Sequence, residues 1–517
     1  MIPLLSQRSR LVDMKTPLRI LSLVTLLAAP TVAQDKLVIE AGRIITQAGK
    51  DIENGVIVIE DGRIRAIGTA DQIEKPWDAT VLGGPELVAF PGFVEAHTSR
   101  GMDRPNENID VAPFLDIQDS VDPVSFFFED CLRYGITTVN LQHGFNCVVG
   151  AQGMIVRPTG MTVEEMLVRP RYGTKISLRP KSGKSRATQQ QALRETFDGL
   201  KSYLEELIEA ERDQRGYAER EALAQGRELE DEEKEGRAMK SAAWTVDGLE
   251  LIPRGAIDEK LSPLLDIVEG RRTVFLECHE PVEVHQAVEL AQAQGFADKA
   301  VLVVRPACWR AADQLASSGM PVVLEGGLMD VRRNAVTGEE EETFVPAVLA
   351  EKGVEFAISV ESNAQRSLWY QAAMAVGHGL SRSDALDAVT TTPAKILGLE
   401  GQVGSLEVGK LGNVVLFSGD PLSISSWVEH VIIEGAEVYD RAKDVRNKHL
   451  IDGTQPRGTA AQLEPEEHHQ DEGDDDPDNH GDEEEEGHGD DGDDHSGDDE
   501  EEHHDDDEHH HREGEEN

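Results

Sequence analysis

Short runs of β-branched residues, separated by turns that contain glycine, occur near both ends of the chain. The clearest of them lie at 37–39, 55–59, 413–417 and 431–433. Runs of this length, punctuated by Gly and Asp-Gly turns, are typical of a meander of β-strands. Because the two groups flank a long centre, we expect one small composite β-sandwich built from residues 34–90 and 400–445.

The centre of the chain alternates short apolar strands with helical patterns. Strands are expected at 135–139, 273–277, 300–304, 321–324 and 354–359. Helical patterns such as 284–294 and 344–351 lie between several of them. Repeated strand–helix units predict an α/β barrel or an open parallel sheet. In a barrel, the functional side chains are expected where the strands end.

A long, strongly charged segment interrupts this alternation at 189–240. Leu200, Tyr203, Leu204 and Leu207 form one apolar stripe at helical spacing, and beyond Tyr217 the sequence is dominated by charged residues. One apolar stripe on an otherwise polar helix is typical of a solvated helix that packs on a larger body. We therefore expect a charged helical insertion in the central region.

The N-terminal segment 1–33 has the features of an export signal. Lys15 and Arg19 precede the apolar run 20–29, and small residues follow at 31–33. A positive region, an apolar region and a small-residue cleavage site predict a signal peptide, with Gln34 as the mature start. An uncleaved anchor is the alternative, but the run is shorter than the roughly 20 residues of a membrane span. We expect an exported protein, periplasmic or extracellular, without a transmembrane span after cleavage.

The formal charge of −49 is concentrated at the C-terminal end of the chain. Residues 464–517 hold 30 acidic residues and one basic residue, which leaves about −20 for the rest. Such a segment cannot bury enough apolar surface to fold, so we expect 446–517 to be a linker and a disordered tail. No basic patch is present to neutralise phosphates, which argues against nucleic acid as a partner.

Ten of the 17 histidines lie in this acidic tail. Imidazoles among carboxylates make a flexible chelator for zinc, nickel or copper. The clusters are His503, His504, His509, His510 and His511. Metal ions at the tail are one interpretation, and a purely solubilising tail is the other.

Four separated motifs give the chain a family resemblance. Residues 91–99, PGFVEAHTS, resemble the signature PG-(L/F)-(I/V)-(D/E)-x-H-x-H of the amidohydrolase superfamily. Residues 132–139, 391–399 and 404–410 resemble further motifs of that family in the same order. The chain looks most like its imidazolonepropionase-like group. The resemblance covers roughly residues 36–440 and implies a TIM (β/α)8-type barrel, here at 91–399, with a small β-sandwich.

The resemblance also implies an activity, the metal-dependent hydrolysis of non-peptide carbon–nitrogen bonds in a small-molecule substrate. In such a site one or two divalent ions lower the pKa of a bound water, and a carboxylate takes its proton. The family pattern has two histidines after strand one, one histidine each after strands five and six, and an aspartate after strand eight.

These positions are mostly substituted here. His97 matches the first histidine, but Ser99 takes the place of the second. Glu277 falls at the strand-five histidine, Arg305 at the strand-six histidine and Glu361 at the aspartate. A guanidinium cannot bind a metal and repels one. One of five expected ligands is therefore unchanged.

Two interpretations of the site follow. In the first, His97, Glu277 and Glu361, with or without His279, hold one divalent ion, zinc being the first candidate, and Glu361 is the catalytic base. In the second, Arg305 replaces the positive charge of the metal and pairs with Glu277 and Glu361, so that no ion is bound. The protein is then a catalytically inactive binding or scaffold protein of the cell envelope, or a metal buffer through its tail.

Three further residues are expected to line the pocket beside Ser99 and Arg305. Gln142 and His143 follow the second barrel strand and are expected to form hydrogen bonds in its loop. Arg157 follows a glycine-rich loop that resembles a loop of the imidazolonepropionase-like group, where the family pattern has lysine.

The four cysteines, Cys131, Cys147, Cys278 and Cys308, include no CxxC pair and give no disulfide framework.

Overall fold

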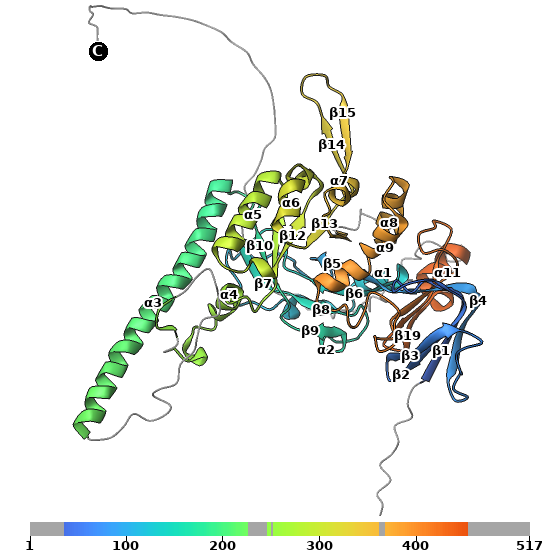
Figure 1. Ribbon diagram of the computed structural model, residues 1–517, viewed down its shortest axis with the longest axis horizontal. Coiled ribbons are helices and arrows are strands. Elements are labelled where there is room, and N and C mark those ends of the chain that lie inside the picture. The colour runs from blue at the N-terminus through green and yellow to red at the C-terminus, as the bar shows by residue number, and fades with distance from the viewer. Residues whose placement is uncertain (1–35, 226–245, 250–251, 361–367, 453–517) are drawn as a thin grey trace, which may run out of the picture. The chain divides into compact units, whose positions relative to one another are not determined.

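The computed structural model describes residues 36–225, 246–249, 252–360 and 368–452 (Figure 1). The expected signal segment 1–33, Glu361 and all five of the named tail histidines lie outside the described residues. The chain divides into two units, Met1–Thr454 and Gln455–Asn517, and the description below concerns the first.

Both ends of the first unit contribute strands to one sheet of seven strands within the described residues, in the order β19-β18-β17-β4-β1-β2-β3. Its strands are β1 (Lys36–Ile44), β2 (Ile52–Glu60), β3 (Arg63–Thr69), β4 (Thr80–Pro91), β17 (Val414–Phe417), β18 (Val428–Ile433) and β19 (Ala436–Asp440). β4 joins the two groups, because it pairs parallel with β1 and antiparallel with β17.

The period-two alternation of the sequence explains the core of this sheet. Ile39 and Ile59 are buried on one face together with Leu416 and Ile432, which come from the other end of the chain. The sheet also curls back on itself, since the Ile64 amide donates to the Lys410 carbonyl at 2.9 Å. This packing needs both ends of the chain at once, as expected for a composite sandwich.

The central strands form the wall of a barrel (Figure 1). They are β5 (Phe93–Thr98), β6 (Ile136–Leu141), β7 (Val149–Gln152), β8 (Met154–Val156), β10 (Thr174–Ser177), β11 (Val274–Cys278), β12 (Ala300–Val304), β13 (Val322–Glu325) and β16 (Phe356–Ser359). β5 runs parallel to β6, and a second parallel series consists of β10, β11, β12, β13 and β16. The Ser359 hydroxyl, at the end of β16, donates toward the His97 carbonyl and so joins the series to β5.

One position of the wall departs from a regular (β/α)8 pattern. β8 pairs antiparallel with β6, and β7 pairs antiparallel with β10. The two short strands are separated only by Gly153, so they cross the gap between the parallel series in the reverse direction. The fold is therefore a TIM-type barrel with a β-sandwich, as the sequence predicted, with one reversed strand position.

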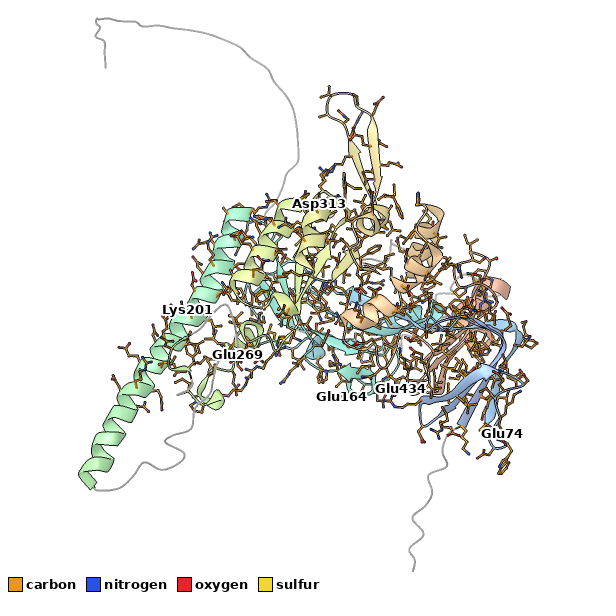
Figure 2. The ribbon with its side chains drawn as sticks, in the orientation of Figure 1. Glu74, Glu164, Lys201, Glu269, Asp313 and Glu434 are labelled. Carbon is orange, nitrogen blue, oxygen red and sulfur yellow. The ribbon has the colours of Figure 1, made fainter. Side chains whose placement is uncertain are left out.

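Helices pack around the barrel and, in the case of α11, beside the sandwich sheet (Figure 1). They are α1 (Phe126–Arg133), α2 (Val163–Met166), α3 (Arg186–Gln225), α4 (Ser262–Val268), α5 (Pro281–Ala293), α6 (Ala312–Ser318), α7 (Val345–Glu351), α8 (Leu368–Gly377), α9 (Arg382–Asp387), α10 (Thr391–Ile396) and α11 (Val445–Asp452). α3 begins the expected insertion 189–240 and carries Lys201 on its surface (Figure 2). Leu200 and Leu204 of the predicted stripe are buried, whereas Tyr203 and Leu207 are half-buried.

Smaller elements complete the described residues. The strands are β9 (Leu167–Arg169), β14 (Met329–Arg333) and β15 (Glu340–Phe344), of which β14 and β15 form a hairpin that projects from the barrel (Figure 1). The 3-10 helices lie at Ile117–Ser120, Arg254–Ala256, Ala297–Lys299, Pro306–Ala311 and Arg441–Lys443. All four cysteines are free and buried.

An ion-pair network connects the barrel helix α1 to the segment that follows β19. The Arg133 guanidinium donates to Asp444 at 2.8 Å and to Asp130 at 2.9 Å, and the Tyr439 hydroxyl donates to Asp444 at 3.0 Å. Burial alone would raise the pKa of Asp444, but the hydrogen bonds from Arg133 and Tyr439 hold it below its usual value. Asp444 is buried, so its charge depends on these donors.

We expect Arg133→Leu to lower the free energy of unfolding by about 1–3 kcal/mol, because it leaves a buried carboxylate without its cation. Arg446→Leu is the matched control, since Arg446 contacts Asp130 at 3.3 Å with a side chain that is 53% exposed. An exposed pair contributes less than about 1 kcal/mol. Urea denaturation of the three proteins measures both effects, and equal losses would contradict the prediction.

Candidate binding site in the barrel mouth

The barrel interior is apolar along the strands and charged where the strands end. Strand alternation and register place Phe275, Val303, Val323 and Ala357 in one buried apolar group. Two residues further along their strands, Glu277, Arg305, Glu325 and Ser359 point to the same side. The charged group therefore lies at the carboxyl ends of the strands, where barrel proteins carry their functional residues.

His97 and Glu325 form a buried pair. Nδ1 of His97 lies 2.9 Å from Oε1 of Glu325, and both side chains are almost fully shielded from solvent. Burial alone would raise the pKa of Glu325, but the His97 ring and the Arg305 guanidinium hold it below its usual value. An ionised carboxylate only accepts hydrogen bonds, so Nδ1 of His97 is the donor in this contact.

Glu277 is surrounded by donors. Its carboxylate oxygens lie 2.8 Å from Lys175 Nζ and 2.8 Å from His279 Nε2. Burial alone would raise the pKa of Glu277, but the charge of Lys175 and the His279 hydrogen bond hold it well below its usual value. His279 is itself fixed, because its backbone amide donates to Glu283 of α5 at 2.7 Å. The same Glu283 oxygen accepts from the Glu280 amide at 3.2 Å, and this second contact is part of the capping box at the start of α5.

Arg305 connects the two carboxylates. One guanidinium nitrogen lies 3.3 Å from Glu325 Oε2 and 3.7 Å from Glu277 Oε1. The sequence predicted the pairing of Arg305 with Glu277, and the structure shows it. The other predicted partner, Glu361, lies outside the described residues.

A second carboxyl of the first motif is also buried. The Glu95 carboxyl lies in hydrogen-bond contact with the Ser359 hydroxyl and accepts from the Val360 amide at 3.4 Å, and burial raises its pKa to about 8 against the effect of these contacts. Glu95 is therefore protonated and uncharged at neutral pH. It adds no negative charge to the barrel mouth.

The charges in the barrel mouth bear on whether it fits the divalent ion that the family resemblance implies. Among the described residues, the interior contains the carboxylates Glu277 and Glu325 and the cations Lys175 and Arg305. Each carboxylate is therefore already compensated. At an effective dielectric constant of about 20, a unit charge 4 Å away repels a divalent ion by about 8 kcal/mol. The described residues do not fit a divalent ion.

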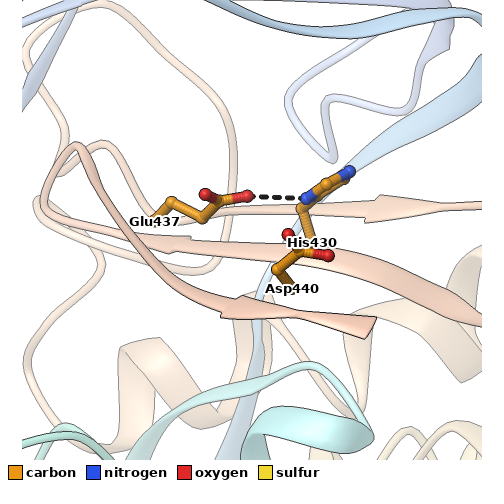
Figure 3. A group of neighbouring side chains, drawn as sticks. All are labelled: His430, Glu437 and Asp440. Atoms are coloured by element: carbon orange, nitrogen blue, oxygen red, sulfur yellow. Dashed lines mark hydrogen bonds and ion pairs between the residues drawn. The ribbon is translucent and has the colours of Figure 1, made fainter. Parts of the chain in front are cut away.

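Among the described residues, three histidine and carboxylate side chains do come together, but they lie outside the barrel mouth. His430, Glu437 and Asp440 are on the surface of β18 and β19, with ligand atoms within 4.8 Å of one another (Figure 3). Nδ1 of His430 already lies 2.7 Å from Glu437, and Lys443 lies 2.8 Å from Asp440. These contacts explain the cluster without an ion.

Three of the other predicted pocket residues are close to the mouth. The Ser99 hydroxyl donates to the His143 carbonyl at 3.1 Å. Gln142 is fully buried, and His143 is 3% exposed. Burial lowers the pKa of His143 to about 4, and the charge of Lys175 contributes in the same direction.

Arg157 was expected at the pocket, and the structure places it elsewhere. It forms an ion pair of 2.7 Å with Glu434. Glu434 lies at the turn between β18 and β19 of the sandwich sheet (Figure 2). The cause is the direction of β8. Because β8 runs antiparallel to β6, the residue that follows it lies at the opposite end of the barrel.

Sequence reasoning missed Lys175 and Glu325. Lys175 lies in β10, which has four residues and no apolar run that would announce it. Glu325 directly follows an apolar run that was expected to end at 324. The available signal for such residues was a charged residue at the end of a buried strand. Of the two missed residues, Glu325 showed this signal.

A barrel with charged side chains at its strand ends, joined to a sheet from both ends of the chain, defines an amidohydrolase-type architecture. Residues 277–438 match the model of the amidohydrolase family. An amidohydrolase from Thermotoga maritima MSB8 has the same fold, with a TM-score of 0.61 and 23% identity over 78% of this chain and 100% of that chain. The family match over residues 277–438 and the shared fold support the resemblance to the amidohydrolase superfamily that the sequence motifs indicated.

Curated relatives match only in part. An imidazolonepropionase from Syntrophobacter fumaroxidans is 29% identical over 148 residues, which are 27% of this chain and 34% of that protein. A 5-methylthioadenosine/S-adenosylhomocysteine deaminase from Moorella thermoacetica is 38% identical over 68 residues, 13% of this chain and 16% of that protein. The chain thus matches about a third or less of these two relatives.

None of the helices in the described part of the chain combines the length and the apolar character needed to cross a bilayer.

The ion pairs of the mouth predict strong energetic coupling between Lys175 and Glu277. We expect Lys175→Met to lower the free energy of unfolding by about 3–5 kcal/mol, because it leaves a buried carboxylate undercompensated. Glu277→Gln removes that charge, so the double variant is expected to lose much less than the sum of the single variants.

The matched control is the exposed pair Lys395–Glu355, at 2.7 Å with side chains 63% and 56% exposed. Its coupling energy is expected to stay below about 1 kcal/mol. A double-mutant cycle by urea denaturation measures both pairs. A Lys175–Glu277 coupling energy no larger than that of the control pair would contradict the prediction that the buried ion pair is strongly coupled.

Proposed function

We propose that this protein binds a small polar molecule in the mouth of an amidohydrolase barrel without a metal ion, and that it does not carry out metal-dependent hydrolysis. The contact that supports this most directly is Arg305 between Glu277 and Glu325, at 3.7 and 3.3 Å. In the family pattern, the positions of Glu277 and Arg305 hold neutral imidazoles. Here they hold charges of opposite sign that neutralise each other.

The charge balance gives the physical reason. A divalent ion is stable in a protein when ionised or neutral donors replace its water shell. Lys175 and Arg305 instead bring two positive charges to the two carboxylates that would have to bind it. Binding an ion would require Glu277 and Glu325 to exchange these partners, and both cations would then be buried beside a divalent charge.

Hydrolysis of carbon–nitrogen bonds is the alternative function, and the names of the relatives favour it, among them a deaminase, an imidazolonepropionase and a dihydroorotase. In that case His97, Glu277 and His279 would hold one ion together with Glu361, which would act as the base. The observation that favours this alternative is the free Nε2 of the buried His97 ring.

Elemental analysis of protein truncated after Thr454, where the first unit ends, tests the proposal. After incubation with excess zinc and exhaustive dialysis, we expect far less than one equivalent of metal, because the interior carboxylates are already paired. The full-length chain is measured in parallel. Metal that is present only in the full-length chain is bound by the tail and leaves the proposal intact.

A positive control comes from restoring the family residues. Ser99→His combined with Arg305→His adds two imidazole ligands and removes one cation, so this variant is expected to bind more zinc than the unchanged protein. About one equivalent of tightly bound metal in the unchanged truncated protein, lost on His97→Ala, would refute the proposal in favour of the hydrolase.

We further propose that the protein is exported and that the acidic tail binds metal ions outside the barrel. The first proposal is supported by the segment 1–33 and the second by the histidine clusters at 503–504 and 509–511. N-terminal sequencing of protein expressed from the full gene in a Gram-negative host is expected to give Gln34 in the periplasmic fraction. Protein that keeps residues 1–33 in the cytoplasm would contradict export.

A further inference from the structure

The hairpin of β14 and β15 has no third strand beside it in the described part of the chain. It projects from the barrel (Figure 1), and its two strands pair only with each other there. Val331 in β14 is 52% exposed, and Val336 near the tip is 94% exposed. A lone two-stranded hairpin is marginally stable in water, and an open strand edge is a template for another strand. The two edges of this hairpin are therefore candidates for pairing with another chain.

The base of the hairpin is fixed to the barrel. The Asp330 carboxylate accepts from the Trp309 indole at 2.8 Å and lies 3.4 Å from the Arg310 guanidinium. At the other end of the pair, the Phe344 ring stacks on the His378 ring, with centroids 5.1 Å apart. A strand that is already held in an extended form loses less conformational entropy when it binds a partner. β14 is therefore preorganised for pairing.

The ladder between β14 and β15 determines which backbone groups face the open edge of β14. The Asn334 amide donates to the Glu339 carbonyl at 2.8 Å, and the Val345 amide donates to the Leu328 carbonyl at 2.9 Å. Hydrogen-bonded pairs alternate with non-bonded pairs in an antiparallel ladder, so the even-numbered residues of β14 bond to β15. The residues whose N–H and C=O groups face outward are Met329, Val331 and Arg333.

The open edge of β14 is complementary to a second copy of itself. If two β14 strands run antiparallel about a twofold axis at Val331, the two copies of Val331 exchange both hydrogen bonds. Met329 then faces Arg333 of the second copy, with outward backbone groups on both sides. Asp330 faces Arg332 of the second copy in a non-bonded pair, where Cα atoms lie about 4.5 Å apart. Opposite charges in such pairs stabilise a sheet, and the axis forms this pair twice.

The open edge of β15 lacks this self-complementarity. Glu340, Glu341 and Glu342 are consecutive in β15, and all three are exposed. Two β15 strands that paired with each other around these residues would place carboxylates opposite carboxylates, which destabilises a sheet. Of the two edges, only that of β14 suits a symmetric pairing.

We propose that the β14 edge joins two copies of this chain into a twofold-symmetric dimer, with a continuous sheet in the order β15-β14-β14-β15. Backbone hydrogen bonds centred on Val331 hold the two hairpins together, and the ion pairs between Asp330 and Arg332 fix the register. A contact between two hairpins buries little area, so the dimer is reversible and depends on protein concentration.

Sedimentation velocity of the full-length protein over a range of concentrations tests the dimer. Each chain carries a formal charge of −49, so the measurement is made at physiological ionic strength, where repulsion beyond about 8 Å is screened. Val331→Pro removes an outward N–H group, and proline is compatible with an edge strand, so the hairpin itself is retained. We expect this variant to raise the dissociation constant of the dimer at least about tenfold.

Matched variants separate the two edges and the two arginines. Glu342→Pro makes the same backbone change at the open edge of β15 and is expected to leave the dissociation constant unchanged. Arg332→Asp places a carboxylate opposite Asp330 of the second copy and is expected to weaken the dimer several-fold. Arg333→Asp makes the same charge change opposite Met329 and is expected to have a smaller effect. Circular dichroism confirms that each variant is folded.

A cross-link locates the axis. All four native cysteines are buried, so Val331→Cys adds one exposed thiol. Cα atoms in a hydrogen-bonded pair lie about 5.5 Å apart, which a disulfide can span. Mild oxidation with copper phenanthroline is therefore expected to give a covalent dimer. Val336→Cys, at a more exposed position away from the axis, is expected to cross-link far less.

A protein that stays monomeric up to its solubility limit would overturn the inference, and so would a dimer that Val331→Pro leaves intact. Assemblies that grow beyond two chains and are weakened by Glu342→Pro would also overturn it. They would show that β14 pairs with β15 of the next copy, an arrangement that does not close. Weakening by Val331→Pro but not by Glu342→Pro supports the twofold pairing.

Discussion

The arrangement of the barrel mouth depends on a guanidinium held between two buried carboxylates. Arg305 contacts Glu277 and Glu325, and these two residues in turn fix Lys175, His279 and His97. In a medium of low dielectric constant, an isolated charge costs several kcal/mol, and a compensated pair costs far less. The buried charges of this cluster therefore stabilise the barrel mouth only when they are present together.

This constraint divides the mouth into two halves of different chemistry. The strands β10 to β13 carry charges that are satisfied by one another. On the other side, His97 of β5 and the two residues directly after β6, Gln142 and His143, are also buried, and Nδ1 of His97 faces Glu325. His97 therefore joins this side to the ion pairs of the other.

The fold was largely predictable from the sequence, and the site only in part. The motifs at 91–99 and 391–399 and the apolar strand runs indicated the barrel and the composite sheet. The family pattern also brought His97, Glu277 and Arg305 to one place. The predicted position of Arg157 was wrong. A strand and its reverse have the same hydrophobic alternation, so this pattern does not indicate the direction in which a strand runs.

Lys175 and Glu325, which the sequence analysis did not identify, complete the charge balance of the barrel mouth. In the metal-free site that we propose, the positive charge that a family member takes from a divalent ion is supplied by two monovalent cations of the chain itself, Lys175 and Arg305. Fixed cations differ from an ion in one physical respect, because a guanidinium or ammonium has no vacant coordination position and cannot activate a water molecule as a Lewis acid. The same charge balance that stabilises the barrel thus favours binding over hydrolysis.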